Sequence, residues 1–144
     1  LQDYKKWLGS LVAGPSGSKD KADMVLAIYG LLTRFLDLQK PLADAAWSEE
    51  KERLPVGISD EEIDASKTGL AKGVRQRLFR EIEDHTRAFF AQNMEAGQDI
   101  PFPALVKAVR SLERVAGLVE INLSDGVALE FFLLASLRHW TARR

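Results

Sequence analysis

The sequence has no cysteine and only two histidines among its 144 residues. The absence of cysteine excludes disulfides, thiolate metal sites, iron–sulfur clusters and a cysteine nucleophile. Neither His85 nor His139 has a glutamate three residues before it, so the paired Glu-x-x-His motif of helical di-metal sites is absent. The acidic run between Asp60 and Asp64 lacks the glycine-centred spacing of a calcium loop. We therefore expect no metal ion and no cofactor.

The chain also lacks an excess of one charge and a long apolar run. Its 20 Lys+Arg and 21 Asp+Glu give a net charge of −1, so nucleic acid or anionic lipid would need a local basic patch. The most apolar stretch, from Val127 to Leu137, is interrupted by Glu130 and Ser136 and is far shorter than the roughly 20 residues of a membrane span. We expect a cytoplasmic protein without a membrane span. Because it starts at Leu1 rather than methionine, we expect a processed chain or one excised from a longer protein.

Apolar residues recur at steps of three and four through most of the chain, which is typical of amphipathic helices. The length suits one domain with a substantial core. We expect a single all-α domain over residues 1–144, built as a bundle of five or six helices. The pattern predicts helices over 2–12, 22–39, 42–53, 60–94, 103–117 and 124–142.

Several residues predict where these helices begin, bend or end. Pro41 is expected to stop the second helix, because an interior proline removes a backbone hydrogen bond. Ser59 and Glu62 have the spacing of a capping box and predict a helix start. Gly73 is a candidate kink or break in the long helix that follows. The alternation of apolar and polar residues over 119–123 is a weak strand signal.

The last helix has almost no polar side over its middle turns. Apolar residues occupy nearly every position from Val127 to Leu137, and Trp140 follows one turn later. A helix that is apolar all round is normally surrounded by other helices. We therefore expect it at the centre of the bundle; the alternative is that half of its surface belongs to a partner.

Two short motifs resemble functional sites but do not have the full pattern that such sites require. The segment AGPSGSKDKAD, residues 13–23, opens like a phosphate-binding loop, but Lys19 and Asp20 stand where the P-loop pattern requires glycine and lysine. His85 follows Glu81 by four residues and could act as a general base, although a histidine at the edge of the core fits the same pattern. No convergent catalytic set emerges, and enzymatic activity is not expected.

Charge is distributed unevenly, and this is the clearest sign of a partner. Residues 44–64 carry eight carboxylates against two basic residues, whereas residues 67–144 carry twelve basic residues against nine acidic ones. A basic face formed by the last three helices could hold a phosphate backbone. The candidate nucleic-acid contacts are Arg75, Arg110, Arg114, Arg138 and Arg143, with Lys107 beside them.

A second candidate surface is a row of small residues, Ala65, Gly69 and Gly73, spaced four apart. Such a row lets another helix approach closely. It predicts either tight packing inside the domain or a groove for a partner helix.

Two functions remain open from the sequence. The first is a helical protein–protein interaction, scaffold, regulatory or assembly domain without catalytic activity, whose partner is another protein or a second copy of the chain. The alternative is a small helical subunit of a nucleoprotein complex that contacts the phosphate backbone through its basic face.

Overall fold

The computed structural model describes residues 2–13, 17–97, 102–120 and 124–141. It confirms an all-α architecture, and no described residue lies in a strand. The helices are α1 (Gln2–Ala13), α2 (Ser18–Lys51), α3 (Asp60–Glu95), α4 (Phe102–Glu120) and α5 (Asp125–Thr141).

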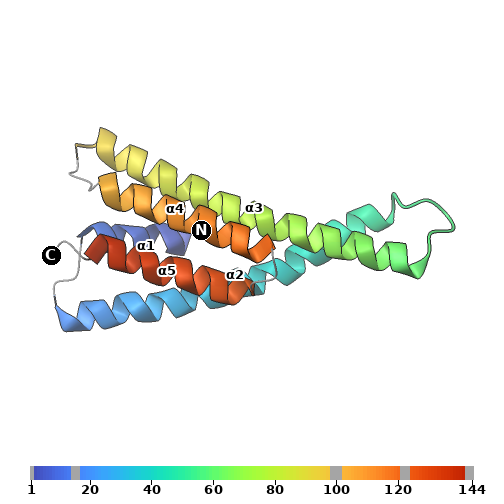
Figure 1. Cartoon of the computed structure of the whole chain (residues 1–144), viewed down its shortest axis with the longest axis horizontal. Helices are drawn as coiled ribbons and strands as arrows, with labels where there is room; N and C mark the ends of the chain where they lie inside the picture. Colours follow the sequence, from blue (N-terminus) through green and yellow to red (C-terminus); the bar gives the residue numbers. More distant parts are fainter. Residues whose placement is uncertain (1, 14–16, 98–101, 121–123, 142–144) are drawn as a thin grey trace.

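The body of the molecule is formed by α1, α4, α5 and the adjoining parts of the two long helices (Figure 1). Helix α5 packs most extensively on α4 and also contacts α2 and α1, while α3 contacts α2, α4 and α1. The core lies among these five helices, since each turns an apolar stripe inward. Its largest fully buried side chains include Leu8, Ile28, Phe90, Leu112 and Phe132.

Beyond the body, α2 and α3 continue as a two-helix hairpin, which we call the arm (residues 41–70). Figure 1 shows it extending past the ends of α1, α4 and α5. Among the described residues from Leu36 to Gly73, none is buried. The apolar side chains between the two arm helices, such as Leu42 and Trp47, remain half-buried. The arm therefore has no hydrophobic core of its own.

The prediction that Pro41 ends a helix is wrong, because α2 runs unbroken from Ser18 to Lys51. A proline at position 41 removes the hydrogen bond to the carbonyl of Asp37. Both residues are exposed, so water can satisfy this carbonyl and the helix continues into the arm. The separate helix expected over 42–53 is the second half of α2.

Two further boundaries differ from expectation. Helix α3 passes through Gly73 without a break, and α4 continues through Gly117 to Glu120. The weak strand expected over 119–123 is therefore helical where the structure describes it, at 119–120, and residues 121–123 lie outside the described part. Capping at the start of α3 is confirmed, since Ser59 and Glu62 form the reciprocal hydrogen bonds of a capping box.

Helix α5 has one buried and one exposed face. Ala128, Leu129, Phe132 and Leu133 are buried, whereas Val127 and Phe131 are 53% and 55% exposed. The expected position at the centre of the bundle is not confirmed, because none of the described residues covers the apolar strip of α5 at Val127 and Phe131. None of the helices, over the residues described, is long and apolar enough to cross a membrane.

Candidate functional site

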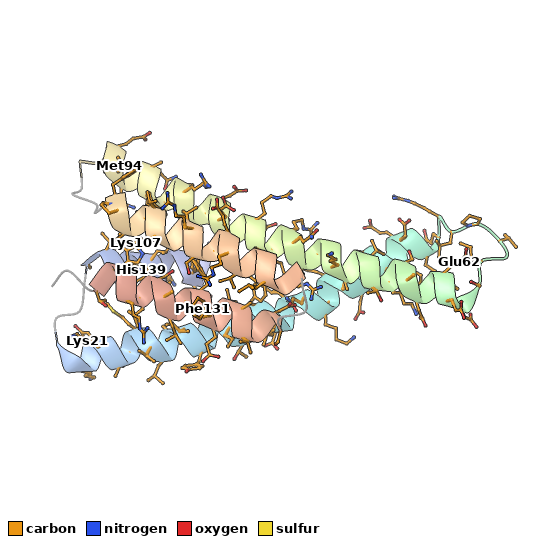
Figure 2. The ribbon with its side chains drawn as sticks, viewed as in Figure 1. Lys21, Glu62, Met94, Lys107, Phe131 and His139 are labelled. Atoms are coloured by element: carbon orange, nitrogen blue, oxygen red, sulfur yellow. The ribbon has the colours of Figure 1, made fainter. Side chains whose placement is uncertain are left out.

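The exposed face of α5 forms one wall of an open groove, and α4 forms the other. The groove has a volume of about 600 Å³. It lies on the body, and Figure 2 shows Lys107, His139 and Phe131 along these two helices. The lining residues are Lys107, Arg110, Ser111, Arg114, Phe131, Leu134, Ala135, Arg138 and His139.

Helical spacing explains why these side chains meet. Lys107, Arg110 and Arg114 are separated by three and four residues, so they follow one face of α4. Leu134 and Arg138 are related in the same way on α5. The adjoining face of α4 carries the buried Ala108, Leu112 and Val115, and this packing leaves the basic face toward solvent. We call this site the basic groove.

The basic groove carries four cationic side chains, and no carboxylate is among its lining residues in the part of the chain that the structure describes. Lys107, Arg110, Arg114 and Arg138 are all exposed. An open surface lined by charges of one sign produces a field that attracts an oppositely charged partner. Phe131 and Leu134 add apolar surface between the cations. The groove is suited to an anionic partner that also buries apolar groups.

His139 lies in the basic groove with an altered acidity. Partial burial lowers the pKa of His139 below its ordinary value of 6.5, and the positive charge of Lys107 lowers this pKa further. Both effects disfavour the charged imidazolium. The ring is therefore neutral at pH 7 and offers one hydrogen-bond donor and one acceptor. His85, in contrast, is half-buried on α3 and does not line the groove.

The structure brings together three of the five arginines proposed as nucleic-acid contacts. Arg110, Arg114 and Arg138 share the basic groove. Arg75 lies elsewhere: its Nη1 donates to Asp125 Oδ1 at 2.9 Å, and both side chains are largely withdrawn from solvent. Arg143 lies outside the described residues.

Ion pairs on the helix surface neutralise only some of the arginines near the basic groove. Arg87 binds Glu83 at 2.6 Å and Glu113 at 3.4 Å, and these contacts neutralise it. Arg77 and Arg80 each have a carboxylate four residues later, Glu81 and Asp84, but form no ion pair in the part of α3 described. None of the four cations of the basic groove is in an ion pair with a described carboxylate.

The row of small residues lies on α3, at the base of the arm and just beyond it. Ala65, Gly69 and Gly73 are exposed, and a Cβ added at either glycine would meet no atom within 4 Å. Tight packing inside the domain, one of the two interpretations of this row, is therefore wrong. A groove for a partner helix stays a prediction.

Sequence reasoning missed Phe131 and His139 as members of the site. Their signal was present in the spacing, because Phe131, Ala135 and His139 are four residues apart and so share a helix face. The uniform apolarity of α5 hid this face. For metals, no group of three or more potential ligand residues occurs within the residues described.

Comparisons of the chain with protein-family models, with curated proteins and with solved structures find no match. What the protein does is therefore inferred from its own residues.

Proposed function

We propose that this chain is a helical interaction and assembly module, without catalysis of its own, that recognises an acidic protein partner through the basic groove. The observation that supports this most strongly is the composition of the groove. Lys107, Arg110, Arg114 and Arg138 line the groove together with the exposed Phe131 and the half-buried Leu134. Exposed apolar patches rimmed by polar groups commonly mark interfaces, and arginine and aromatic residues are enriched in them.

The two faces of α5 also favour this function. Val127 and Phe131 are exposed to water, so their apolar surface does not contribute to the free energy of folding. Burial of this surface by a partner would contribute about 25 cal/mol per Å². A partner on the basic groove would cover Phe131 and complete the enclosure expected of such a helix.

The proposal is tested by affinity capture from a nuclease-treated lysate of the source organism. Three baits are compared: the natural chain, an Arg110→Glu/Arg114→Glu variant, and a control variant with Lys5→Glu and Lys19→Glu, two exposed lysines outside the groove. We expect one defined set of proteins to be retained by the natural chain and the control and lost from the groove variant. Identical eluates from all three baits would contradict the proposal.

A second candidate function is contact with a nucleic-acid backbone in the same groove. The observation in its favour is that the four cations lie beside an exposed aromatic ring, Phe131, because single strands bind basic grooves and stack their bases on aromatic side chains. Labelled oligonucleotides titrated at about 50 and 200 mM salt should lose affinity steeply as salt rises. Changing Arg110, Arg114 and Arg138 to glutamate should abolish binding; unchanged binding would exclude the groove as the contact.

A further inference from the structure

The arm presents a surface of the opposite character to the basic groove. Residues 41–70 carry eight carboxylates and three basic residues, a net charge of −5. The carboxylates are concentrated toward the end of the arm, where Figure 2 shows Glu62 far from the labelled groove residues. We define the acidic tip as residues 49–64. It contains Glu49, Glu50, Glu52, Asp60, Glu61, Glu62 and Asp64.

The acidic tip also exposes apolar side chains. Val56 is fully exposed in the loop that joins α2 and α3, and Leu54 and Ile58 beside it are only half-buried. The same tight loop requires Gly57 at a φ of 96°, a conformation that glycine adopts without strain. The tip is thus a compact apolar turn flanked by seven carboxylates against two basic side chains, Lys51 and Arg53.

Neither the described part of its own chain nor the arm of another copy is suited to cover the tip. Helix α3 is continuous from Asp60 to Glu95, so the arm is held away from the body and cannot fold back onto its own groove. Two arms packed tip to tip would bring together two net charges of −5, which repel each other. The complementary surface must be basic and must contain apolar groups.

The basic groove has both properties. The four cations of the groove, with no carboxylate among the described lining residues, are complementary in charge to the carboxylates of the tip. Phe131 and Leu134 provide an apolar surface on which the apolar turn of the tip can pack. We propose that the acidic tip of one copy docks in the basic groove of a second copy, so that the chain assembles head to tail. This inference rests on the proposed function and names the acidic partner as the chain itself.

Such a contact is heterologous, because each copy contributes a different surface. Every bound copy still exposes one tip and one groove, so assembly continues until a ring closes or a filament grows. The contact is largely electrostatic at its rim, and salt should weaken it, since the Debye length falls from about 10 Å at 0.1 M to about 3 Å at 1 M.

The inference is tested with two charge-reversed variants of the purified chain. The groove variant carries Arg110→Glu and Arg114→Glu, and the tip variant carries Glu49→Lys and Glu61→Lys. Both changed glutamates are exposed, and the capping residue Glu62 is left intact. The control for the tip variant is Asp84→Lys/Glu95→Lys, which reverses two exposed carboxylates of α3 outside the tip. Circular dichroism checks that every variant keeps its helical content.

Sedimentation velocity over a series of concentrations measures the association. We expect the natural chain and the control to form species larger than a monomer at low salt and to dissociate as salt rises. Each variant alone should be monomeric. An equimolar mixture of the groove and tip variants should associate again, because the natural tip of the groove variant still fits the natural groove of the tip variant. The reversed tip and the reversed groove also carry opposite charges, so they add a second contact. This rescue is expected only if the two surfaces bind each other.

Three outcomes would overturn the inference. They are a natural chain that stays monomeric at low salt, association that neither variant weakens, and a mixture that fails to restore it. If the chain is monomeric but the groove variant still loses its captured proteins from the lysate, head-to-tail assembly is wrong and the proposed function stands. If the groove variant instead loses only oligonucleotide binding and keeps its captured proteins, the nucleic-acid function replaces both the proposed protein-interaction function and head-to-tail assembly.

Discussion

Thr86 shows how a single buried hydroxyl joins two helices. Its Oγ1 donates to the carbonyl of Ile82 at 2.6 Å and accepts from the hydroxyl of Tyr4 at 2.7 Å. Both side chains are almost completely buried. Burial raises the pKa of Tyr4 well above its usual range, although the hydrogen bond to Thr86 acts in the opposite sense. Tyr4 therefore remains a hydrogen-bond donor at all physiological pH values, and it anchors α1 to α3.

Changing either member of this pair should destabilise the fold by different amounts. Tyr4→Phe removes a donor while Thr86 keeps its bond to Ile82, so we expect a loss of about 1 kcal/mol. Thr86→Val leaves the Tyr4 hydroxyl buried without its acceptor, and we expect a larger loss, about 1–3 kcal/mol. Urea unfolding measures both. The double variant should cost less than the sum of the two; an additive result would show that the hydroxyls are not coupled.

His139 provides a reporter for the basic groove. Burial and Lys107 lower its pKa in the folded chain, so the unfolded chain takes up the proton first as the pH falls. The stability of the fold should therefore decrease as the pH drops below about 6.5, the unfolded value, until His139 is protonated in the folded state as well. NMR titration of the imidazole gives this pKa directly.

Removing the nearby charge should shift that pKa in a known direction. Lys107→Gln should raise the pKa of His139, because the imidazolium no longer faces a lysine ammonium. An acidic partner bound in the groove should raise it too. Lys5→Gln, outside the groove, serves as the control and should leave the His139 titration unchanged. A pKa that does not respond to Lys107→Gln would show that burial alone lowers it.

At the scale of elements, we expect the arm to be the least stable of the described helical parts. It has no buried residue, and its stability depends on the partial burial of side chains such as Trp47, over whose ring the Lys67 ammonium lies 5.1 Å from the centroid. Most helical stability in proteins comes from packing of an apolar face. The amide protons of the arm should accordingly exchange faster than those of the body.

Pro41 weakens the arm at its base, and its replacement should strengthen it. An interior proline costs a helix about 3 kcal/mol relative to alanine. Pro41→Ala restores the hydrogen bond to Asp37, so we expect slower amide exchange in residues 42–51. The control is Pro55→Ala in the loop of the tip, which should not slow amide exchange in residues 42–51. Equal exchange rates in the natural chain and in Pro41→Ala would indicate that the helix has adapted to the proline without cost.

At the scale of the whole molecule, Asp125 holds three helices together where the arm leaves the body. Its carboxylate, in the first turn of α5, accepts from Arg75 of α3 at 2.9 Å and from Gln39 of α2 at 2.9 Å. The side chain of Asp125 is only 14% exposed and that of Arg75 30% exposed. This cluster fixes the direction of the arm relative to α5, and hence the placement of the tip relative to the groove.

Loss of this carboxylate should destabilise the body more than loss of a surface pair. Asp125→Ala leaves Arg75 partly buried without its anion, and we expect a cost of about 1–3 kcal/mol. Asp44→Ala breaks the exposed pair with Lys40 and should cost less than about 0.5 kcal/mol. Urea unfolding of the two variants gives the comparison. Equal losses would show that the Asp125 cluster stabilises the body no more than an exposed ion pair does.

The sequence predicted much of the helical structure but less of its continuity. Periodicity located the regions of all the helices that the structure describes, although it divided α2 in two. The Ser59 and Glu62 spacing located the start of α3, because capping depends on residues four positions apart or fewer. The helix breaks or ends predicted at Pro41, Gly73 and Gly117 were wrong. The effect of such a residue on a helix depends on whether the disrupted backbone faces water or a neighbouring element. The sequence also could not predict the partial burial of Arg75, because its partner Asp125 lies fifty residues away in the chain.

The sequence by itself determined the all-α class, the charge asymmetry between the region around the arm and the last helices, and the identity of the cations. These properties depend on composition and on local spacing. Only the tertiary structure decided that α2 and α3 extend together as an arm without a core, that Arg110, Arg114 and Arg138 share one groove, and that Phe131 lies exposed beside them. Each of these depends on which helix faces which, and packing between residues distant in the chain sets that arrangement.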